Sequence, residues 1–381
     1  MNKVKNKTLH VASTSGINIG DILIAQCVNK LITRNVVTAD IKNENFEVSH
    51  PSSVNIKSRL INSLNRIPVL MPALKKIRFK VKTSKRINKL ADQYDELIIG
   101  GGNLLFNKNG CDHLELCKEY TKIFKSKGKK VSYISVGVGP LEGKYESQLD
   151  YILKNADVIT VRDQLSKNIL ADSKHYYRSD IEIIIDPVWY IPDIKVLEKK
   201  PTNKYFGINV MDFTKTKQFG SDKFQFENLI MNIYEISIKS NLKPIFIISA
   251  YTNDHVIMRK LSDELENRFG IKCSSITLPE LNSKSEIWDV WLSLEFVISH
   301  RMHVSIMGLA FKIPTVVFPW QNKISGVLGS VLGTENILLT DVNFRSNEVL
   351  DKIKSQKENI KEIEKEIESS KVKYKKAYDD F

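Results

Sequence analysis

The residues best suited to chemistry lie in a short stretch of the last third of the chain. The apolar run from Phe296 to Ser299 is followed at once by His300, Arg301 and His303. This pattern predicts a buried strand and then a helix whose first N–H groups attract anions. A fixed cation beside imidazoles that titrate near neutral pH indicates chemistry on a phosphorylated or carboxylated molecule. Histidines that merely end a strand are the alternative, which stays open here.

A second positive group follows the next apolar run. Residues Thr315 to Phe318 read as a buried strand, and Lys323 and Gly326 come after it in a polar loop. Ligands of open α/β sheets bind beyond the carboxyl ends of the strands. Lys323 is therefore a second candidate for binding an anion.

Strand and helix signals alternate along most of the chain. Strands of the first half are expected at Leu9–Ser13, Glu96–Ile99, Lys130–Val136, Asp157–Val161 and Ile181–Ile185. Those of the second half are expected at Tyr205–Val210, Lys243–Ser249, Ile271–Thr277, Phe296–Ser299 and Thr315–Phe318. Helical periodicity lies between them, for example at Asp21–Thr33, Phe226–Lys239 and Asp254–Phe269. The fold class is therefore α/β, with two Rossmann-like halves of parallel sheet that face a cleft.

Length and composition support two domains. A chain of 381 residues with 42% hydrophobic content can bury a large core. We predict domains at residues 1–195 and 196–345, followed by charged helices at 346–381 that pack back across the first half. No signal peptide is expected, because Met1 to Lys7 is polar, and no run approaches the roughly 20 apolar residues of a membrane span. Cysteines without Cys-x-x-Cys spacing favour a reducing cytoplasm and indicate no metal site.

The net charge of +13 is carried unevenly. Between Lys57 and Lys89 basic residues recur without any acidic residue, and apolar residues lie among them at helical spacing. We expect Pro68 and Pro72 to break this insert into short pieces. It is either a solvated helical face or a surface that docks on anionic lipid headgroups, and the sequence leaves both open. Nucleic acid is not expected as a partner, because only Phe79 could stack on a base.

Three loops of the first half also carry candidate residues. Asn18-Ile19-Gly20-Asp21 follows the first strand, where Asp21 is either a helix cap or a ligand group. Gly100-Gly101-Gly102-Asn103 would let a ligand approach the backbone closely, although it is not a dinucleotide fingerprint. Arg162 follows another strand, and it is either a salt-bridge partner in the neighbourhood of Asp163 or an anion clamp.

Taken in order, these short motifs resemble the polysaccharide pyruvyl transferase family. The resemblance is carried by Asn18-x-Gly20-Asp21, Gly100-Gly101-Gly102-Asn103, Ser135-Val136-Gly137-x-Gly139-Pro140, Val161-Arg162-Asp163, Asp186-Pro187, Ser299-x-Arg301-Met302-His303, Pro314 and Lys323-x-x-Gly326. It covers most of the chain except the basic insert and the tail. Met302 stands where the family typically has Leu. The resemblance implies a glycosyltransferase B-like architecture, which agrees with the two halves inferred above.

The family resemblance implies that phosphoenolpyruvate donates a pyruvyl group to two sugar hydroxyls, which forms a cyclic ketal and releases phosphate. Arg162 and Arg301 would clamp the carboxylate and phosphate of the donor. His303 would be the general acid. Lys323 would neutralise the departing phosphate, and Asn18, Asp21 and Asn103 would orient sugar hydroxyls.

The same resemblance implies the remaining partners. The acceptor would be a sugar of a surface polysaccharide or of its lipid-linked precursor, bound by the first domain, with the donor on the second. Phosphoenolpyruvate is the co-substrate, and no other cofactor is expected. The expected substrate-binding residues are Asn18, Gly20, Asp21, Gly101, Gly102, Asn103, Gly137, His300 and Lys323. A nucleotide-sugar glycosyltransferase, or a non-catalytic saccharide- or membrane-binding protein, is the alternative.

The basic insert generates a prediction about membranes. If it docks on anionic lipid at the inner face of the cytoplasmic membrane, the protein should co-sediment with anionic vesicles at low salt. Raising the ionic strength should release it, because the Debye length falls from about 10 Å at 0.1 M to about 3 Å at 1 M. Changing Lys75, Lys76, Arg78 and Lys80 to Gln should reduce sedimentation and leave activity on a soluble acceptor largely intact. A parent protein that ignores such vesicles at low salt would exclude this role.

Overall fold

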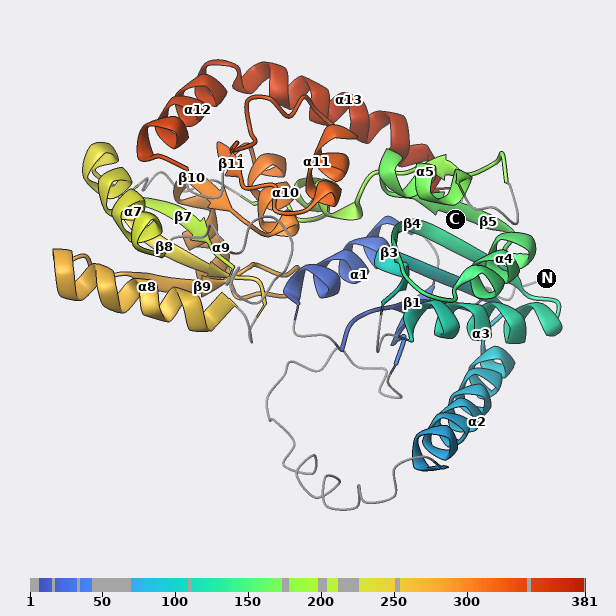
Figure 1. The fold of residues 1–381 in the computed structure, drawn as a ribbon. Coiled ribbons are helices and arrows are strands. Elements are labelled where there is room, and N and C mark those ends of the chain that lie inside the picture. Colours follow the sequence, from blue (N-terminus) through green and yellow to red (C-terminus); the bar gives the residue numbers. More distant parts are fainter. Residues whose placement is uncertain are drawn as a thin grey trace.

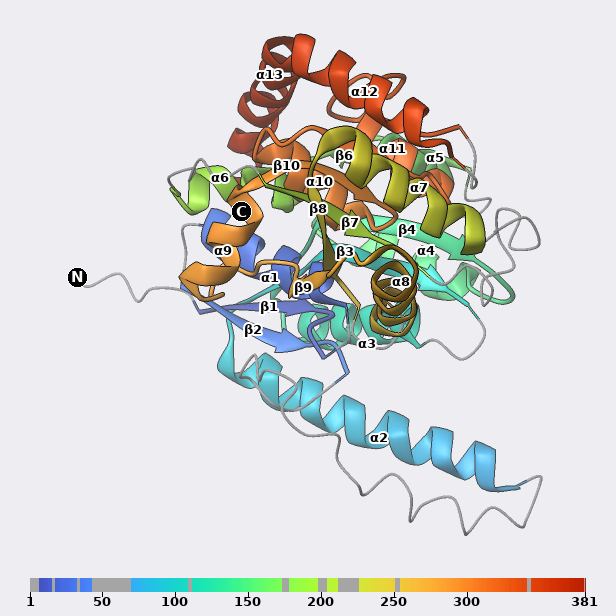
Figure 2. The same ribbon diagram turned by 90° about the vertical axis from the view of Figure 1, so that its left-hand side faces the viewer.

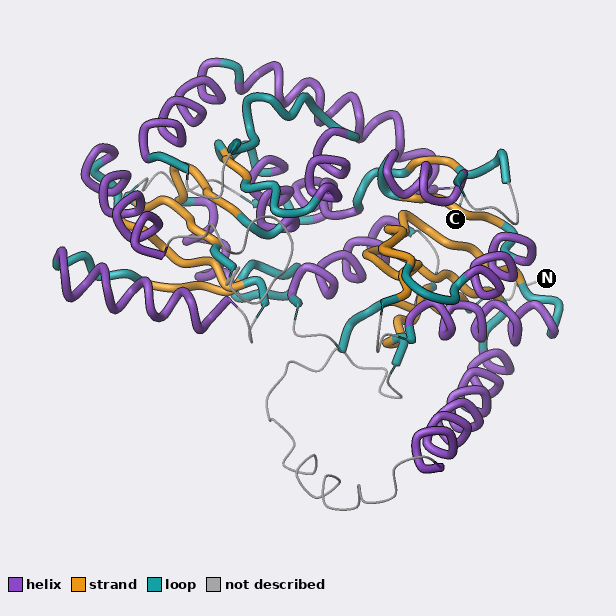
Figure 3. Tube along the Cα trace, viewed as in Figure 1, coloured by secondary structure: helices purple, strands orange, loops and turns teal. Residues whose placement is uncertain are grey.

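The computed structural model describes residues 7–15, 18–32, 35–42, 70–108, 112–172, 178–197, 204–211, 226–250, 254–340, 344–379 and 381. Of residues 70–80 and 379 it describes only the backbone. Two parallel sheets, each covered by helices, form the body of this part of the chain (Figures 1 and 3).

The first sheet has six strands in the order β2-β1-β3-β4-β5-β6. These strands are β1 (Thr8–Ala12), β2 (Val36–Asp40), β3 (Glu96–Asn107), β4 (Lys130–Leu141), β5 (Val158–Val161) and β6 (Glu182–Ile183). The connecting helices are α1 (Ile19–Leu31), α2 (Leu70–Gln93), α3 (His113–Ser126), α4 (Glu146–Asn155) and α5 (Gln164–Ala171). The apolar faces of α3 and α4 pack in a core with one face of this sheet, whereas α1 covers the other face.

The second sheet has five strands in the order β11-β10-β7-β8-β9. They are β7 (Tyr205–Asn209), β8 (Lys243–Ile248), β9 (Ser274–Thr277), β10 (Leu294–Ser299) and β11 (Thr315–Val317). Its helices are α7 (Phe226–Ser240), α8 (Asp254–Phe269), α9 (Ser285–Leu292), α10 (Met302–Ala310) and α11 (Asn322–Gly329). The link between the sheets contains a short 3₁₀ helix, η3 (Pro187–Tyr190), and α6 (Ile191–Ile194). The prediction of an α/β fold with two parallel, Rossmann-like halves is confirmed.

Three details of the strand predictions are wrong. Strand β2 was not expected, because its residues are only half-buried at the edge of the sheet. Strands β3 and β4 run well past the predicted ends at Ile99 and Val136. The Gly100–Asn103 motif therefore lies inside a strand and not in a loop. Gly101 and Gly102 adopt positive φ values of 70° and 83°, which only glycine adopts easily, and the register against β4 shifts just after them.

Helix α1 lies between the two sheets and joins them (Figure 1). Its first residue, Ile19, donates a backbone hydrogen bond of 2.8 Å to the carbonyl of Ser249 in the second half. Near the middle of the helix, the Gln26 side chain accepts from the Leu281 N–H and donates to Glu280. The apolar side chains of α1 belong to the same core as those of the second sheet. The two halves are therefore tied through α1.

The charged tail forms two helices, α12 (Ser346–Glu358) and α13 (Ile360–Asp379), that arch over both halves (Figures 1 and 2). The Gln356 side chain of α12 hydrogen bonds to both backbone groups of Thr315 in β11. At the far end of α13, the Tyr378 hydroxyl donates to the carbonyl of Ile185, at the end of the first half. The tail therefore packs mainly on the second half and reaches the first half near the end of α13.

The basic insert differs from its prediction. From Leu70 onward it is one 24-residue helix, α2, which projects from the body (Figure 2). Pro72 lies in its first turn, where no helical hydrogen bond is lost, so the expected break there does not occur. Residues 57–69, including Pro68, lie outside the described residues. Arg86 is not a free surface charge, because it donates to the Ile41 carbonyl and the Tyr120 hydroxyl. In the described part of the chain, no helix is both long and apolar enough to cross a bilayer.

Candidate active site

A pocket with about 470 Å³ of empty space, including its mouth, opens between the two halves. Its walls come from the carboxyl-terminal ends of strands in both sheets, where an open α/β sheet binds ligands. The lining residues are Asn18, Asp21, Asn103, Arg162, Ser249, Arg301, Met302, His303, Trp320, Lys323 and Ile324. The pocket therefore brings together seven of the predicted site residues from separate parts of the sequence.

The starts of four helices meet at this pocket. Asn18 caps α1 and accepts a hydrogen bond from the Gly20 N–H at 3.2 Å. Arg301 is the residue before α10, Lys323 lies in the first turn of α11, and Arg162 comes two residues before α5. Helix N-termini carry partial positive charge. The backbone therefore adds to the positive potential of the Arg and Lys side chains, which favours an anionic ligand.

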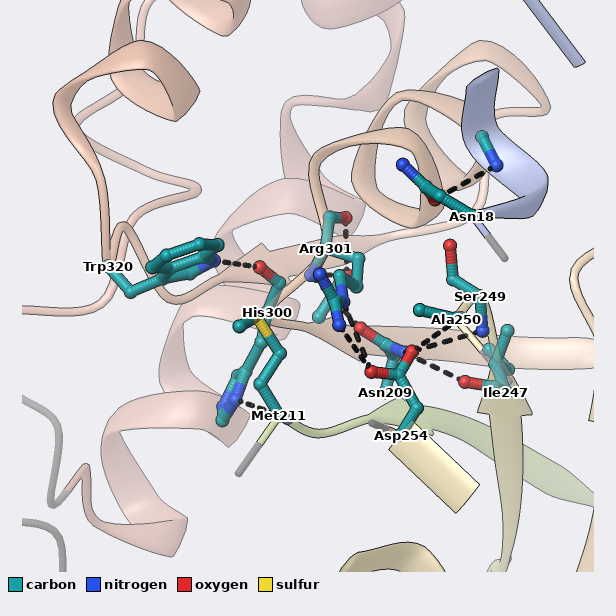
Figure 4. Close-up of polar contacts among 12 residues, drawn as sticks. Asn18, Asn209, Met211, Ile247, Ser249, Ala250, Asp254, His300, Arg301 and Trp320 are labelled. Carbon is teal, nitrogen blue, oxygen red and sulfur yellow. Dashed lines mark hydrogen bonds and ion pairs between the residues drawn. The ribbon is translucent and has the colours of Figure 1, made fainter. Parts of the chain in front are cut away.

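Arg301 is held by Asp254, the first residue of α8 (Figure 4). Its Nε and Nη2 donate to one carboxylate oxygen at 3.1 and 2.7 Å. Asp254 is fully buried and also accepts from the backbone N–H groups of Ser249 and Ala250. Asn209 fixes the Arg301 backbone, because its side-chain oxygen accepts the Arg301 N–H at 3.0 Å. The guanidinium is thus held on one side, while 18% of the side chain remains exposed toward the pocket.

Arg162 is almost fully buried between two carboxylates. Its Nε donates to Asp163 at 3.3 Å, and its Nη1 lies 3.8 Å from Asp186. Gly137 leaves room for the guanidinium, because a Cβ at this position would lie 2.8 Å from Nη2. Arg162 is therefore a salt-bridge partner, the first of the two readings that the sequence left open. It also lines the pocket, and its role as an anion clamp stays a prediction.

His303 lies in the first turn of α10, with its ring against α1. A Cβ on Gly20 would lie 2.1 Å from Nδ1, so glycine allows the two helix starts to meet here. On its other edge, Nε2 lies 3.6 Å from a carboxylate oxygen of Asp186. Only 8% of the His303 side chain is exposed. The imidazole, which comes from the second half, is therefore confined between two residues of the first half at the pocket wall.

Two further groups in the pocket have shifted pKa values. Burial and the charge of Arg162 lower the pKa of Lys323 to about 8, although Asp21 acts in the opposite direction. Burial also raises the pKa of Asp21, and the nearby charges of His303 and Lys323 offset this only in part. Asn18 donates a hydrogen bond of 3.1 Å to the Asp21 carboxyl. The pocket therefore holds an acid and a base whose protonation a charged ligand would change.

His300 does not line the pocket. Its ring packs at 5.0 Å from that of Phe318, and its Nδ1 accepts the Met211 N–H at 3.3 Å (Figure 4). Burial and the neighbouring charge of Arg301 lower the pKa of His300 to about 3. It is therefore neutral at physiological pH, and its contacts are those of a structural residue behind the site.

The predicted glycines lie behind the pocket rather than on its surface. A Cβ on Gly101 would approach the Ile24 side chain of α1 to 2.1 Å, so Gly101 allows close packing of helix on strand. Gly102 lies near Asp21, and Gly20 and Gly137 make room for His303 and Arg162 as described above. Gly20 and Gly137 therefore make room for side chains of the pocket, and Gly101 makes room for the packing of α1.

Sequence reasoning missed the buried carboxylates of the site. Asp254 was assigned only to the start of a helix, and Asp186 only to an Asp-Pro motif. Neither partner could be found from spacing, because Arg301 is 47 residues from Asp254 in the chain. Ser249, Trp320 and Ile324 were missed for the same reason. Among the residues that the structure describes, no three His, Cys, Asp or Glu side chains gather as metal ligands.

Two Rossmann-like α/β domains with a ligand pocket between them define the glycosyltransferase B class of fold. Within it, the chain belongs to the polysaccharide pyruvyl transferase family, whose model matches residues 18–322. The match includes His303, Arg301 and Arg162 and ends just before Lys323. A search of curated proteins gives no match.

Solved structures show the same fold at low sequence identity. A glycosyltransferase from Rickettsia africae has a TM-score of 0.57 at 11% identity, over 98% of this chain and 94% of its own. The UDP-GlcNAc 2-epimerase from Methanocaldococcus jannaschii has a TM-score of 0.55 at 11% identity, over 91% of each chain. The HepE protein from Anabaena, solved with UDP, has a TM-score of 0.53 at 12% identity, over 98% and 96%. These similarities establish the architecture.

The contact between Gly20 and His303 generates a prediction. In Gly20→Ala the new methyl group would overlap the imidazole, so the ring must shift away from α1. We expect a loss of roughly 10-fold or more in kcat, because misplaced catalytic groups lose much of their effect, with the cooperative thermal transition retained. Gly329→Ala in α11 is the matched control, since its Cβ meets only the Thr334 side chain at 3.8 Å. Equal activity of both variants would show that the position of His303 does not matter.

Proposed function

We propose that this protein transfers the pyruvyl group of phosphoenolpyruvate to a sugar of a surface polysaccharide, or of its lipid-linked precursor, and forms a pyruvate ketal. One observation carries the proposal: Arg162, Arg301, Lys323 and His303, from both domains, face one small pocket. The chain's family supports the transferase class. A donor with a carboxylate and a phosphate matches that set of cations.

Donor binding would use the three fixed cations. Arg301 keeps a partly exposed guanidinium, and Arg162 is held at the opposite wall by Asp163 and Asp186. Planar guanidinium groups bind carboxylate and phosphate oxygens in pairs, which makes both residues suited to clamp the donor. Lys323, whose pKa is lowered to about 8 by burial and by Arg162, would be fully charged once a phosphate dianion lies beside it. Lys323 is then placed to stabilise the departing phosphate.

His303 would act as the general acid. In the proposed reaction its proton goes to the methylene carbon of phosphoenolpyruvate, which makes the adjacent carbon electrophilic. One sugar hydroxyl then adds to that carbon and a second displaces phosphate, so that two C–O bonds form and one breaks. Of the two hydroxyl protons, one returns to His303 and the other leaves with hydrogen phosphate. The imidazole is regenerated for the next turnover.

Acceptor binding would use the polar groups of the first domain. Asn18, Asp21 and Asn103 line the pocket beside the cations. The side-chain nitrogen of Asn103 already donates to the Gly139 carbonyl at 2.9 Å, which directs its oxygen toward Arg162 and Gly137. Amide and carboxyl groups form hydrogen bonds with sugar hydroxyls in either direction. These residues can therefore orient two neighbouring hydroxyls.

The experiment that tests the function is incubation with phosphoenolpyruvate and a panel of saccharides. Phosphate release that depends on one saccharide, together with a product heavier by one pyruvyl ketal in mass spectrometry, would support the proposal. Phosphate release without any acceptor would indicate a phosphatase. A protein that turns over nucleotide sugars and leaves phosphoenolpyruvate intact would contradict the proposal.

Replacing Arg301 by Lys should impair use of the donor. The guanidinium of Arg301 donates to Asp254 through Nε and Nη2 and has further N–H groups to offer to a carboxylate of the donor. The single ammonium group of lysine cannot reproduce both sets of hydrogen bonds. We expect the KM for phosphoenolpyruvate to rise roughly 10-fold or more, which corresponds to about 1.4 kcal/mol of lost binding. Arg259→Lys, on an exposed face of α8, is the matched control. An unchanged KM in Arg301→Lys would remove Arg301 from the donor site.

Replacing His303 by Ala should remove the acid. We expect kcat to fall roughly 10²- to 10⁴-fold, the usual contribution of a positioned acid or base. The KM for phosphoenolpyruvate should change much less, because the Arg and Lys side chains remain. His255→Ala, an exposed histidine of α8, should behave like the parent protein. Near-normal turnover in a folded His303→Ala variant would assign proton transfer to another group, and Asp21 would be tested next.

A further inference from the structure

The contact of Asp186 with His303 is the feature of the site that the proposed function leaves unused. It is completely buried just before η3, and one carboxylate oxygen accepts the Val188 N–H at 3.1 Å. The other oxygen, Oδ2, has no hydrogen-bond partner among the described residues, and neither does Nε2 of His303. These two atoms lie 3.6 Å apart. Oδ2 also lies 3.8 Å from Nη1 of Arg162, which is too far for a hydrogen bond. A buried carboxylate oxygen without a hydrogen bond is costly, so its position beside the imidazole calls for an explanation.

We propose that Asp186 is a positioning residue, whose carboxylate fixes the His303 ring through Nε2–H and stabilises the imidazolium, so that Nδ1 delivers the proton. This inference rests on the proposed function for the role of His303 as an acid. Nδ1 is the nitrogen beside Gly20, a residue that lies in sequence between the pocket residues Asn18 and Asp21. The Nε2 edge faces the buried carboxylate and is closed to a ligand.

The position of Asp186 is itself held by contacts from distant elements. The Ser135 hydroxyl lies 3.0 and 3.3 Å from the carbonyls of Ile184 and Ile185, directly before Asp186. Ser135 adopts a φ of 47°, a strained conformation for a residue with a side chain, which places its hydroxyl under that segment. The Tyr378 hydroxyl of α13 donates to the same Ile185 carbonyl at 2.8 Å. The carboxylate therefore cannot move away from His303 without breaking several buried hydrogen bonds.

The electrostatics of the pair agree with this role. Burial alone would raise the pKa of Asp186, but His303, Arg162 and the Val188 N–H together hold it below its usual value. The carboxylate is therefore charged at physiological pH. Because the interaction is reciprocal, a charged Asp186 stabilises a charged His303 by the same free energy.

Other groups around the pair act on it as well. Asp21 of α1 is the second carboxyl group that favours a charged imidazole, whereas burial, Arg162, Arg301 and Lys323 oppose it. Cys27 of α1 and Tyr378 of α13 also face Asp186. Burial raises the pKa of each of these two well above its usual value, so both stay neutral.

Asp186→Asn tests the proposal, because the amide oxygen can still accept the Val188 N–H while the charge is lost. We expect the NMR signals of the His303 ring to titrate at least about one pH unit lower than in the parent, the usual effect of one adjacent charge. Labelled histidine supplies the signals, and the signal that disappears in His303→Gln identifies His303. Asp163→Asn is the matched control, since Asp163 pairs with Arg162 and caps α5 at Ser166. In that variant the His303 titration should stay in place.

A second readout concerns catalysis. The acid must be protonated, so the alkaline limb of the kcat profile should move to lower pH in Asp186→Asn. At neutral pH, kcat should fall roughly 10- to 100-fold, part of what a positioned acid supplies. If Asp186 serves only to cap η3, the Asn side chain preserves the cap, and the titration of the His303 ring and the pH profile of kcat stay unchanged. That result would overturn the proposal.

A third measurement needs no variant. The ¹⁵N shifts of His303 in the parent protein should show that the neutral ring is the Nε2–H tautomer. An Nδ1–H tautomer would overturn the proposal, and this result can be obtained even if Asp186→Asn fails to fold. The NMR results do not depend on turnover. They therefore test the role of Asp186 toward His303 separately from the proposed function. The proposed function is contradicted only if the parent protein transfers no pyruvyl group.

Discussion

Mutual repulsion among the cations of the pocket is the constraint on which the rest of the site depends. Arg162, Arg301 and Lys323 line one small pocket, and Lys323 is largely buried there. Buried charges are tolerated only when they are paired, and each guanidinium here has its own buried carboxylate: Asp254 for Arg301, and Asp163 with Asp186 for Arg162. Lys323 has no carboxylate so close among the described residues, and its pKa falls to about 8 as a result of burial and of Arg162. A bound dianion would remove this residual repulsion, so ligand binding and charge balance are linked.

The same constraint explains why the two domains are fastened so firmly. The cations of the pocket come from both halves, so contacts between the halves fix their separation. Helix α1 supplies these contacts through its apolar face and through the hydrogen bond from Ile19 to Ser249, and α13 adds Tyr378 on the Ile185 carbonyl. Dipoles and charges that are fixed before the substrate arrives need no reorganisation during the reaction. The tail, which carries none of the family motifs, thus contributes to the site by holding the segment that bears Asp186.

The sequence predicted the parts of the site that depend on local pattern. Alternating strands and helices indicate parallel sheets, and residues that follow the strand ends converge in such a fold. For this reason the sequence predicted four residues that line the pocket: Arg162, Arg301, His303 and Lys323. Partners that meet only through the tertiary fold, such as Asp254 with Arg301, left no local signal. His300 shows the opposite error, because it is adjacent to Arg301 in sequence, but its ring turns toward Phe318 and away from the pocket. The glycines of β3 were expected to face a ligand, whereas Gly101 makes room for α1, a role that only the packing reveals.

The fold alone does not define the chemistry, since epimerases and glycosyltransferases share it at 9–13% identity. What distinguishes this chain is how side chains are placed at the starts of its helices. At the first turn of α10, a strand–turn–helix connection places Arg301 and His303 on the pocket side, two residues apart, while the residue before them is buried. In the proposed reaction these two residues would be the clamp and the acid. Their constant separation on one turn would suit a small donor whose anionic groups and reacting carbon are only a few bonds apart. At the opposite wall, Gly20 has no Cβ, and this leaves room for the imidazole at the boundary between the domains.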